Sequence, residues 1–137
     1  MDFKLKNGEN LRTVKAKKAL ATVIEAGDMV AISSGLIIKA VDASEKIAWC
    51  PAGAGDDTTD VEVTVGNDFT LVGTGDTAFA VAKKGAEVDI VVNTGAQQID
   101  LGSSTTDVFI VSIAEDAGVV GSASEIEVRI NPSKVIF

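Results

Sequence analysis

Carboxylates are the most abundant residues in this sequence that could carry out chemistry. The chain has 20 acidic residues and no histidine. Without histidine, Ser-His-Asp and Cys-His catalytic arrangements are excluded, and so are zinc sites that use histidine ligands. Catalysis by this chain would therefore have to depend on carboxylates, lysine or serine.

Two sets of carboxylates have spacings that can be compared with known sites. Asp56, Asp57 and Asp60 could offer oxygens to a cation, but they lack the alternate acids and distal Glu of an EF-hand. Glu62 and Glu127 lie on the polar faces of alternating segments, where a carboxylate pair could in principle hydrolyse a glycosidic bond. However, no Tyr and a single Trp leave few aromatic rings for sugars or bases to stack on. The sequence predicts neither an enzyme nor a metal site.

The remaining candidate motifs also favour structural roles. Gly53-Ala54-Gly55 and Gly73-Thr74-Gly75 are rich in glycine, but neither is followed by Gly-Lys-Ser/Thr or by a predicted helix that could hold a phosphate. We therefore predict flexible turns at both places and no nucleotide or other cofactor. Cys50 is the only cysteine, and a buried, inert thiol is the expected state.

Short strands separated by turn residues account for most of the chain. Met29–Ile32 and Leu36–Val41 flank Ser33-Ser34-Gly35, which predicts a hairpin with Gly35 in the left-handed conformation. Asp60–Val65 and Glu125–Ile130 alternate apolar and polar residues, as half-buried strands do. Because turn signals recur throughout without helical periodicity, we predict an all-β fold. A single compact β-barrel or β-sandwich of short antiparallel strands is the expected architecture.

The charge is unevenly distributed along the chain. The whole sequence has a net charge of −8, but residues 1–18 carry +4 and residues 19–137 carry −12. We predict that residues 1–18 form an extended basic N-terminal arm and that residues 19–137 form a single β-domain that folds without it; a solvated, partly frayed terminus is the alternative. An acidic body repels phosphates, so nucleic acid is not an expected partner. The basic residues of the arm are Lys4, Lys6, Arg12, Lys15, Lys17 and Lys18.

Two apolar groups are candidates for a subunit interface. Trp49 is the only tryptophan, and it is expected either in the core or as an interface anchor. The sequence ends on Val135, Ile136 and Phe137. These three side chains are expected to be covered either by the domain's own sheet or by a neighbouring subunit.

The distribution of apolar residues also bears on location. No apolar run approaches the roughly 20 residues of a membrane helix, so the chain is not expected to span a bilayer. The first residues lack the long apolar region of a signal peptide, which favours folding in the cytoplasm of the producing cell.

Four stretches resemble the small capsid decoration, or cement, proteins of tailed bacteriophages. They are A-G-D-M-V-A-I-S-S-G-L-I-I-K-A-V-D-A-S (26–44), K-G-A-E-V-D-I-V (84–91), I-D-L-G-S-S-T-T-D-V-F (99–109) and V-G-S-A-S-E-I-E-V-R-I-N-P-S (120–133). The resemblance implies homotrimers at the three-fold and quasi-three-fold positions of a phage head, where they clamp neighbouring major capsid subunits. It also implies that the early residues lie as an arm on the capsid surface.

The sequence therefore leads to a structural hypothesis. We expect a capsid decoration protein that is made in the host bacterial cytoplasm, binds the outer surface of the virion and stabilises the capsid lattice, with no enzymatic role. A phage tail or head-fibre module, or a carbohydrate-binding or adhesin-like β-domain, is the alternative.

Overall fold

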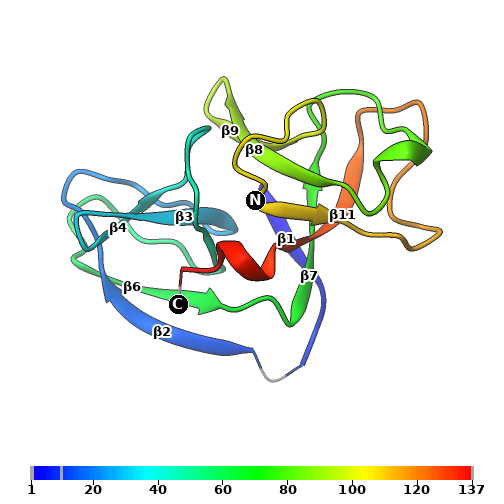
Figure 1. The fold of residues 1–137 in the computed structure, drawn as a ribbon. Helices are drawn as coiled ribbons and strands as arrows, with labels where there is room; N and C mark the ends of the chain where they lie inside the picture. Colours follow the sequence, from blue (N-terminus) through cyan, green and yellow to red (C-terminus); the bar gives the residue numbers. More distant parts are fainter. Residues whose placement is uncertain (1, 10, 137) are drawn as a thin grey trace.

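The computed structural model describes residues 2–9 and 11–136. Within these residues the chain forms two antiparallel sheets, with strand orders β1-β7-β11-β10-β8-β9 and β2-β6-β5-β3-β4 (Figure 1). The prediction of an all-β fold is confirmed, and the strands form two sheets rather than one closed barrel. The elements are β1 (Phe3–Gly8), β2 (Arg12–Lys17), β3 (Asp28–Ser33), β4 (Leu36–Lys39), β5 (Ala48–Cys50), β6 (Asp60–Val65), β7 (Phe69–Thr74), the 3₁₀ helix η1 (Val81–Lys83), β8 (Glu87–Asn93), β9 (Ala96–Asp100), β10 (Phe109–Val111), β11 (Glu125–Ile130) and the 3₁₀ helix η2 (Pro132–Lys134).

A bent two-stranded ribbon connects the two sheets. β1 pairs with β7 in the six-stranded sheet, and β2 pairs with β6 in the five-stranded sheet. The register is the same on both sides of the bend, since Gly8 lies opposite Phe69 and Arg12 lies opposite Val65. Residues 3–8 and 12–17 therefore pair with 69–73 and 60–65 as two halves of one antiparallel ribbon that belongs to both sheets. In Figure 1, β2 and β6 run along the lower side, and β1 and β7 lie to their right.

The predicted N-terminal arm is wrong for the part of residues 1–18 that the structure describes. Phe3 is fully buried, stacks on Phe109 with ring centroids 5.3 Å apart, and donates its N–H to the Gly27 carbonyl at 3.2 Å. Its ring also covers Gly73, where a Cβ would collide with it. The charge of the segment suggested a solvated arm, but lysines at alternate strand positions point to solvent while the strand itself is paired. Because β1 and β2 complete both sheets and Phe3 fills the core, the expectation that residues 19–137 fold alone is also wrong.

The buried residues form two cores, and the five-stranded sheet lies between them. Met29 and Trp49 join the larger core together with residues of the six-stranded sheet, whereas Val30 and Cys50 belong to a smaller core. Both faces of β5 and of residues 29–31 of β3 are thus covered, which explains why these residues are continuously apolar rather than alternating. The five-stranded sheet curls around the smaller core, and the Ala19 N–H beyond β2 donates to the Ile37 carbonyl of β4 at 3.0 Å.

A buried glutamine connects the two sheets through backbone hydrogen bonds. Gln97 of β9 accepts from the Met29 N–H at 2.8 Å and donates to the Met29 and Ala40 carbonyls, each at 2.9 Å. Because its amide is fully satisfied there, the side chain can be buried without an unpaired polar atom. Gln97 therefore fixes β9 of one sheet against β3 of the other.

The predicted hairpin around Ser34 and Gly35 is confirmed, with a tighter turn. Ser33 pairs with Leu36, which leaves a two-residue turn. Ser34 and Gly35 have φ values of 50° and 80°, as a type I′ turn requires at both positions. Among the described residues, no helix is long and apolar enough to cross a membrane.

The ribbon gives a direct prediction for stability. Replacing Phe3 with Ala should lower the free energy of unfolding by about 3–5 kcal/mol, because it removes a buried ring between the sheets. The exposed Lys4→Ala variant is the control and should change it by less than about 0.5 kcal/mol. Urea denaturation followed by Trp49 fluorescence measures both. Equal, small effects would mean that residues near the N-terminus are not part of the folded unit.

Candidate functional site

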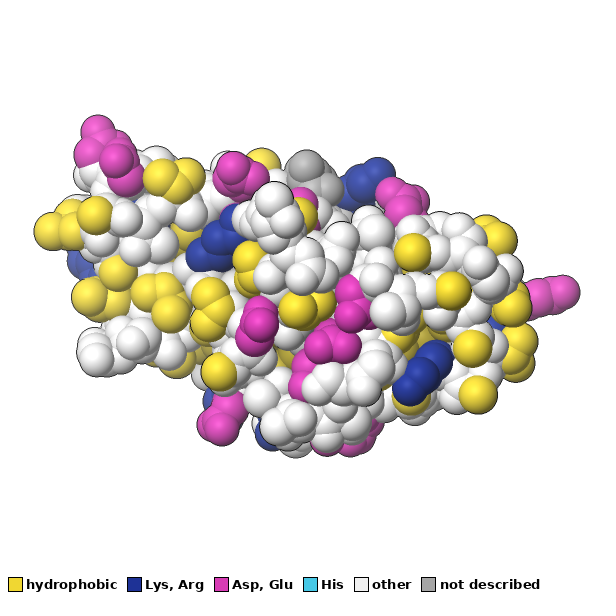
Figure 2. Space-filling view, turned by 90° about the horizontal axis from the view of Figure 1, so that it is seen from above, with side chains coloured by type: hydrophobic (Ala, Val, Ile, Leu, Met, Phe, Trp, Pro, Cys, Tyr) yellow, Lys and Arg dark blue, Asp and Glu magenta, His cyan; other side chains and the backbone are white. Residues whose placement is uncertain are grey.

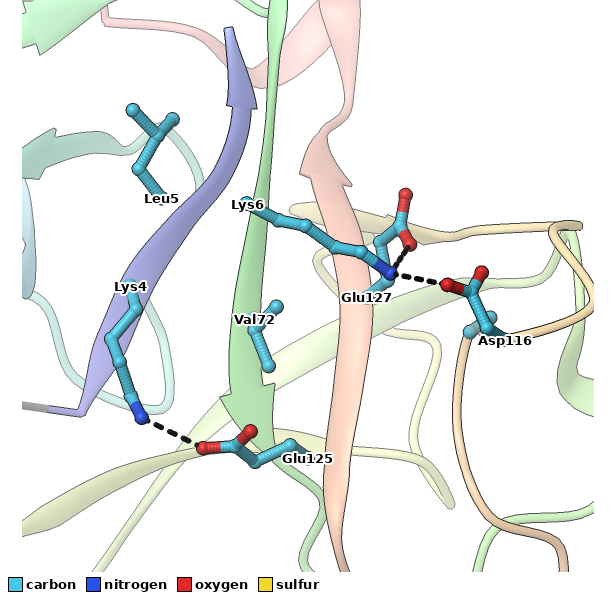
Figure 3. A pocket seen from close by; sticks show the side chains of 8 residues that line it. Lys4, Leu5, Lys6, Val72, Asp116, Glu125 and Glu127 are labelled. Carbon is cyan, nitrogen blue, oxygen red and sulfur yellow. Dashed lines mark hydrogen bonds and ion pairs between the residues drawn. The ribbon is translucent and has the colours of Figure 1, made fainter.

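The six basic residues of the predicted capsid-contact arm are separated by the fold into three environments. Lys4 and Lys6 project from β1 over the outer face of the six-stranded sheet, where they line a shallow groove (Figure 3). Arg12, Lys15 and Lys17 lie on β2, at the edge of the five-stranded sheet. Lys18 is buried. The structure does not bring the six together in one patch.

The lysines of β1 are engaged by carboxylates of the same chain. Lys4 pairs with Glu125 at 3.0 Å, and Lys6 pairs with Glu127 at 2.6 Å and Asp116 at 3.1 Å. Both pairs with β11 reach across β7, as Figure 3 shows on either side of Val72. The groove is consequently a strip of neutralised charge rather than a free basic surface.

Lys6 has the most constrained of these positions. The pairing of β1 with β7 shifts register between Leu5 and Asn7, so Lys6 occupies a bulge, and a bulge can redirect its side chain. Hydrogen bonds to Glu127 and then Asp116 raise the pKa of Lys6, and Lys6 in turn lowers the pKa of Asp116. Glu127 is buried, so Lys6 supplies the charge that a buried carboxylate needs.

The basic residues of β2 are more accessible. Lys17 pairs with Asp60 at 2.7 Å and lowers its pKa. Arg12 and Lys15 are exposed, and no ion pair to either is found among the described residues. Free positive charge from the N-terminal segment is therefore concentrated on β2.

Lys18 has a structural role instead of the predicted contact role. Its ammonium donates to the carbonyls of Ala19 and Thr22 at 2.8 and 2.6 Å. These bonds hold the loop that follows β2 and leave the residue 3% exposed. It is not available to a partner in this conformation.

The candidate interface residues also contact their own chain. Trp49 lies in the larger core and donates its indole N–H to the Gly27 carbonyl at 3.2 Å, so the core alternative describes this residue. Val135 and Ile136 are half-buried and pack against the larger and the smaller core, respectively. Phe137 lies outside the described residues.

The acidic candidates are distributed over both sheets in the described part of the chain. Glu62 is on β6 and Glu127 is on β11, in different sheets. No group of three or more acidic or cysteine side chains is placed to hold a metal ion among residues 2–9 and 11–136. Acidic side chains instead spread over the surface, and Figure 2 shows several of them along the middle of one face.

Asp89 shows how a carboxylate can be used for structure. It accepts from the backbone N–H groups of Thr105, Thr106 and Asp107 and from the Ser103 hydroxyl. These four donors lower the pKa of Asp89 against the opposing effect of burial. These bonds attach the loop of residues 103–107 to β8.

The carboxylate partners of the β1 lysines were missed from the sequence. Lys4-Leu5-Lys6 and Glu125-Ile126-Glu127 have the same spacing, and this complementarity was the available signal. It becomes informative only when both segments are known to flank the same strand.

Comparison of the chain with protein-family models, curated proteins and solved structures found no match.

The Lys6 cluster predicts a characteristic dependence of stability on pH. Lys6→Met should destabilise the protein most between about pH 5 and 10. Asp116 has a lowered pKa, so its contribution is present above the ordinary value of 3.8 and is lost as the pH falls further. Lys6 has a raised pKa, so its contribution is lost as the pH rises beyond the ordinary value of 10.5.

Urea unfolding of both proteins at pH 3, 7 and 11 tests this expectation. The difference between wild type and Lys6→Met should be largest at pH 7. Lys4→Met is the matched control, because both Lys4 and its partner are well exposed, and it should have little effect at any pH. A difference for Lys6→Met that is constant across the three pH values would contradict the charged cluster.

Proposed function

We propose that this protein is a structural protein of a tailed bacteriophage that decorates the outer surface of the capsid. The observation that carries the proposal is the exposed basic edge strand β2, with Arg12 and Lys15 free of ion pairs among the described residues, on a chain whose net charge is −8. The four stretches that resemble capsid decoration proteins support the same assignment. The partners would be the major capsid protein and two further copies of this chain.

The construction of the N-terminal ribbon suits such a role. A clamp has to keep its shape under load, and the ribbon is held by both sheets and by the buried Phe3 ring. Arg12 and Lys15 would meet acidic patches on the shell without first breaking an ion pair. Charges at the rim of an interface mainly accelerate association and make it dependent on salt.

Assembly as trimers would strengthen such contacts. Three linked copies turn successive binding events into intramolecular ones, so individually weak contacts produce a high overall affinity. The acidic remainder of the surface would keep decorated particles soluble and mutually repelling. This role requires no reactive group and no cofactor.

Co-sedimentation with expanded, undecorated heads of the phage that encodes the protein tests the proposal. Saturable binding, with added density at the three-fold and quasi-three-fold positions in images of the heads, is the expected result. No binding to expanded heads would overturn it. Binding to isolated tails, or a specific signal on a glycan array, would instead favour a tail or carbohydrate-binding module.

The charge of β2 can be tested in the same assay. Arg12→Gln combined with Lys15→Gln should slow association with heads several-fold at low salt and flatten its salt dependence. A double variant with Lys46→Gln and Lys83→Gln is the control, since it changes the net charge equally at sites away from β2. Equal behaviour of the two double variants would show that the charges of β2 have no special role.

A further inference from the structure

β2 presents an open edge, since it pairs with β6 on one side and is the terminal strand of its sheet. The direction of its backbone groups follows from the register. Lys18 lies one step beyond the Lys17–Asp60 pair and donates its N–H to the opposite Thr59 carbonyl at 2.8 Å. In an antiparallel ladder, hydrogen-bonded and non-hydrogen-bonded residues alternate. Thr13 and Lys15 therefore direct their N–H and C=O groups away from β6, toward the open edge.

Those groups have no second ladder in the described chain. The isolated bridge next to β2 is formed by Lys18 with Ile37, beyond the end of the strand. The edge around Thr13 and Lys15 is exposed to solvent. It can therefore form backbone hydrogen bonds with an added strand without losing any bond that it already has.

The edge is also held rigidly in an extended conformation. All six residues of β2 are in register with β6, and Val14 and Ala16 pack against the smaller core. A partner would not have to order the strand before binding it. Preorganisation of this kind lowers the entropic cost of association.

β6 shows which sequence pattern complements β2. Its residues Asp-Val-Glu-Val-Thr-Val place Asp60 opposite Lys17 and Glu62 opposite Lys15 on the outer face. The valines between them face the smaller core, beside Val14 and Ala16. A strand on the other side of β2 would meet the same alternation, with basic side chains on one face and small, half-buried apolar side chains on the other.

Lysine on an edge strand is also a common device against self-association. The charge discriminates between partner strands. It repels basic strands, including β2 of a second copy, gives no attraction to neutral strands and attracts acidic ones. The free charge on Arg12 and Lys15 therefore selects a partner of opposite charge.

We propose that the open edge of β2 binds an extended segment of another protein in which carboxylates alternate with β-branched apolar residues. The segment extends the five-stranded sheet beyond β2 through the backbone groups of Thr13 and Lys15. A carboxylate of the segment flanks Lys15, and its apolar side chains continue the row of Val14 and Ala16. The segment ends before Lys18, where the edge is already bridged to Ile37 of β4. This inference goes beyond the capsid assignment and holds for any partner that carries such a segment.

Titration of the isotope-labelled full chain with a capped synthetic peptide Asp-Val-Glu-Val-Thr-Val tests the proposal by NMR. The amide resonances of Thr13 and Lys15 should shift in a saturable manner, and their exchange with water should slow. A peptide with Lys in place of the two acids is the control and should bind at least roughly tenfold more weakly. Absence of shifts on β2 at millimolar peptide, or equal binding of both peptides, would overturn the proposal.

Two substitutions at one position separate the backbone from the charge. Lys15→Thr removes the charge and keeps the outward N–H, so it should weaken binding by up to roughly fivefold. Lys15→Pro also removes that N–H and blocks the edge, so it should weaken binding by at least roughly tenfold. The N–H is not used in the ladder with β6, and thermal unfolding verifies that each variant is folded.

If Lys15→Pro unfolds the protein, Thr13→Pro provides the same test at the other outward-facing position. Binding that is unaffected by a folded proline variant would overturn the proposal. These measurements use the purified protein and a peptide. A negative result with the peptide would overturn strand addition at β2 but not binding to phage heads, which co-sedimentation tests independently.

Discussion

The fold depends on the antiparallel pairing of residues 3–8 with 69–73 and of residues 12–17 with 60–65. Because this ribbon passes from one sheet to the other without losing register, it fixes the position of the sheets relative to each other. The buried Phe3 ring and the Gly27 carbonyl, which accepts from both Phe3 and Trp49, attach the ribbon to the rest of the core. Gln97 provides a second connection at the opposite edge of the six-stranded sheet.

The same pairing determines what the surface can do. On β1, Lys4 and Lys6 pair with carboxylates of β11 across β7, so their charge is used inside the molecule. On β2 the ribbon is the terminal strand, so Arg12 and Lys15 keep their charge and part of the backbone stays unpaired. The N-terminal segment looks uniformly basic in the sequence. In the structure, the lysines of β1 stabilise the fold, whereas Arg12 and Lys15 of β2 remain available to a partner.

Local features of the fold could be predicted, and long-range pairing could not. The Ser34-Gly35 turn is encoded by adjacent residues, and the alternating segments 60–65 and 125–130 became strands with the expected bounds. Segment 77–82 has strand-forming residues, yet it forms a loop and part of η1. Within it, the buried Phe79 pairs with Val120 through an isolated bridge rather than a ladder. Which strand lies next to the N-terminal segment depends on residues 43 (Lys17 to Asp60) to 70 (Phe3 to Gly73) positions away. Strand propensity alone does not specify such a partner.

Native-state hydrogen exchange along β2 tests the central claim most directly. If the ribbon is an integral part of both sheets, the amides of Val14 and Ala16 should exchange only through global unfolding, with protection equal to that of core strands. The amides of Thr13 and Lys15, which face the open edge, should exchange much faster in the same experiment. Rapid exchange of all four amides would contradict the account, because it would mean that the segment detaches locally as an arm does.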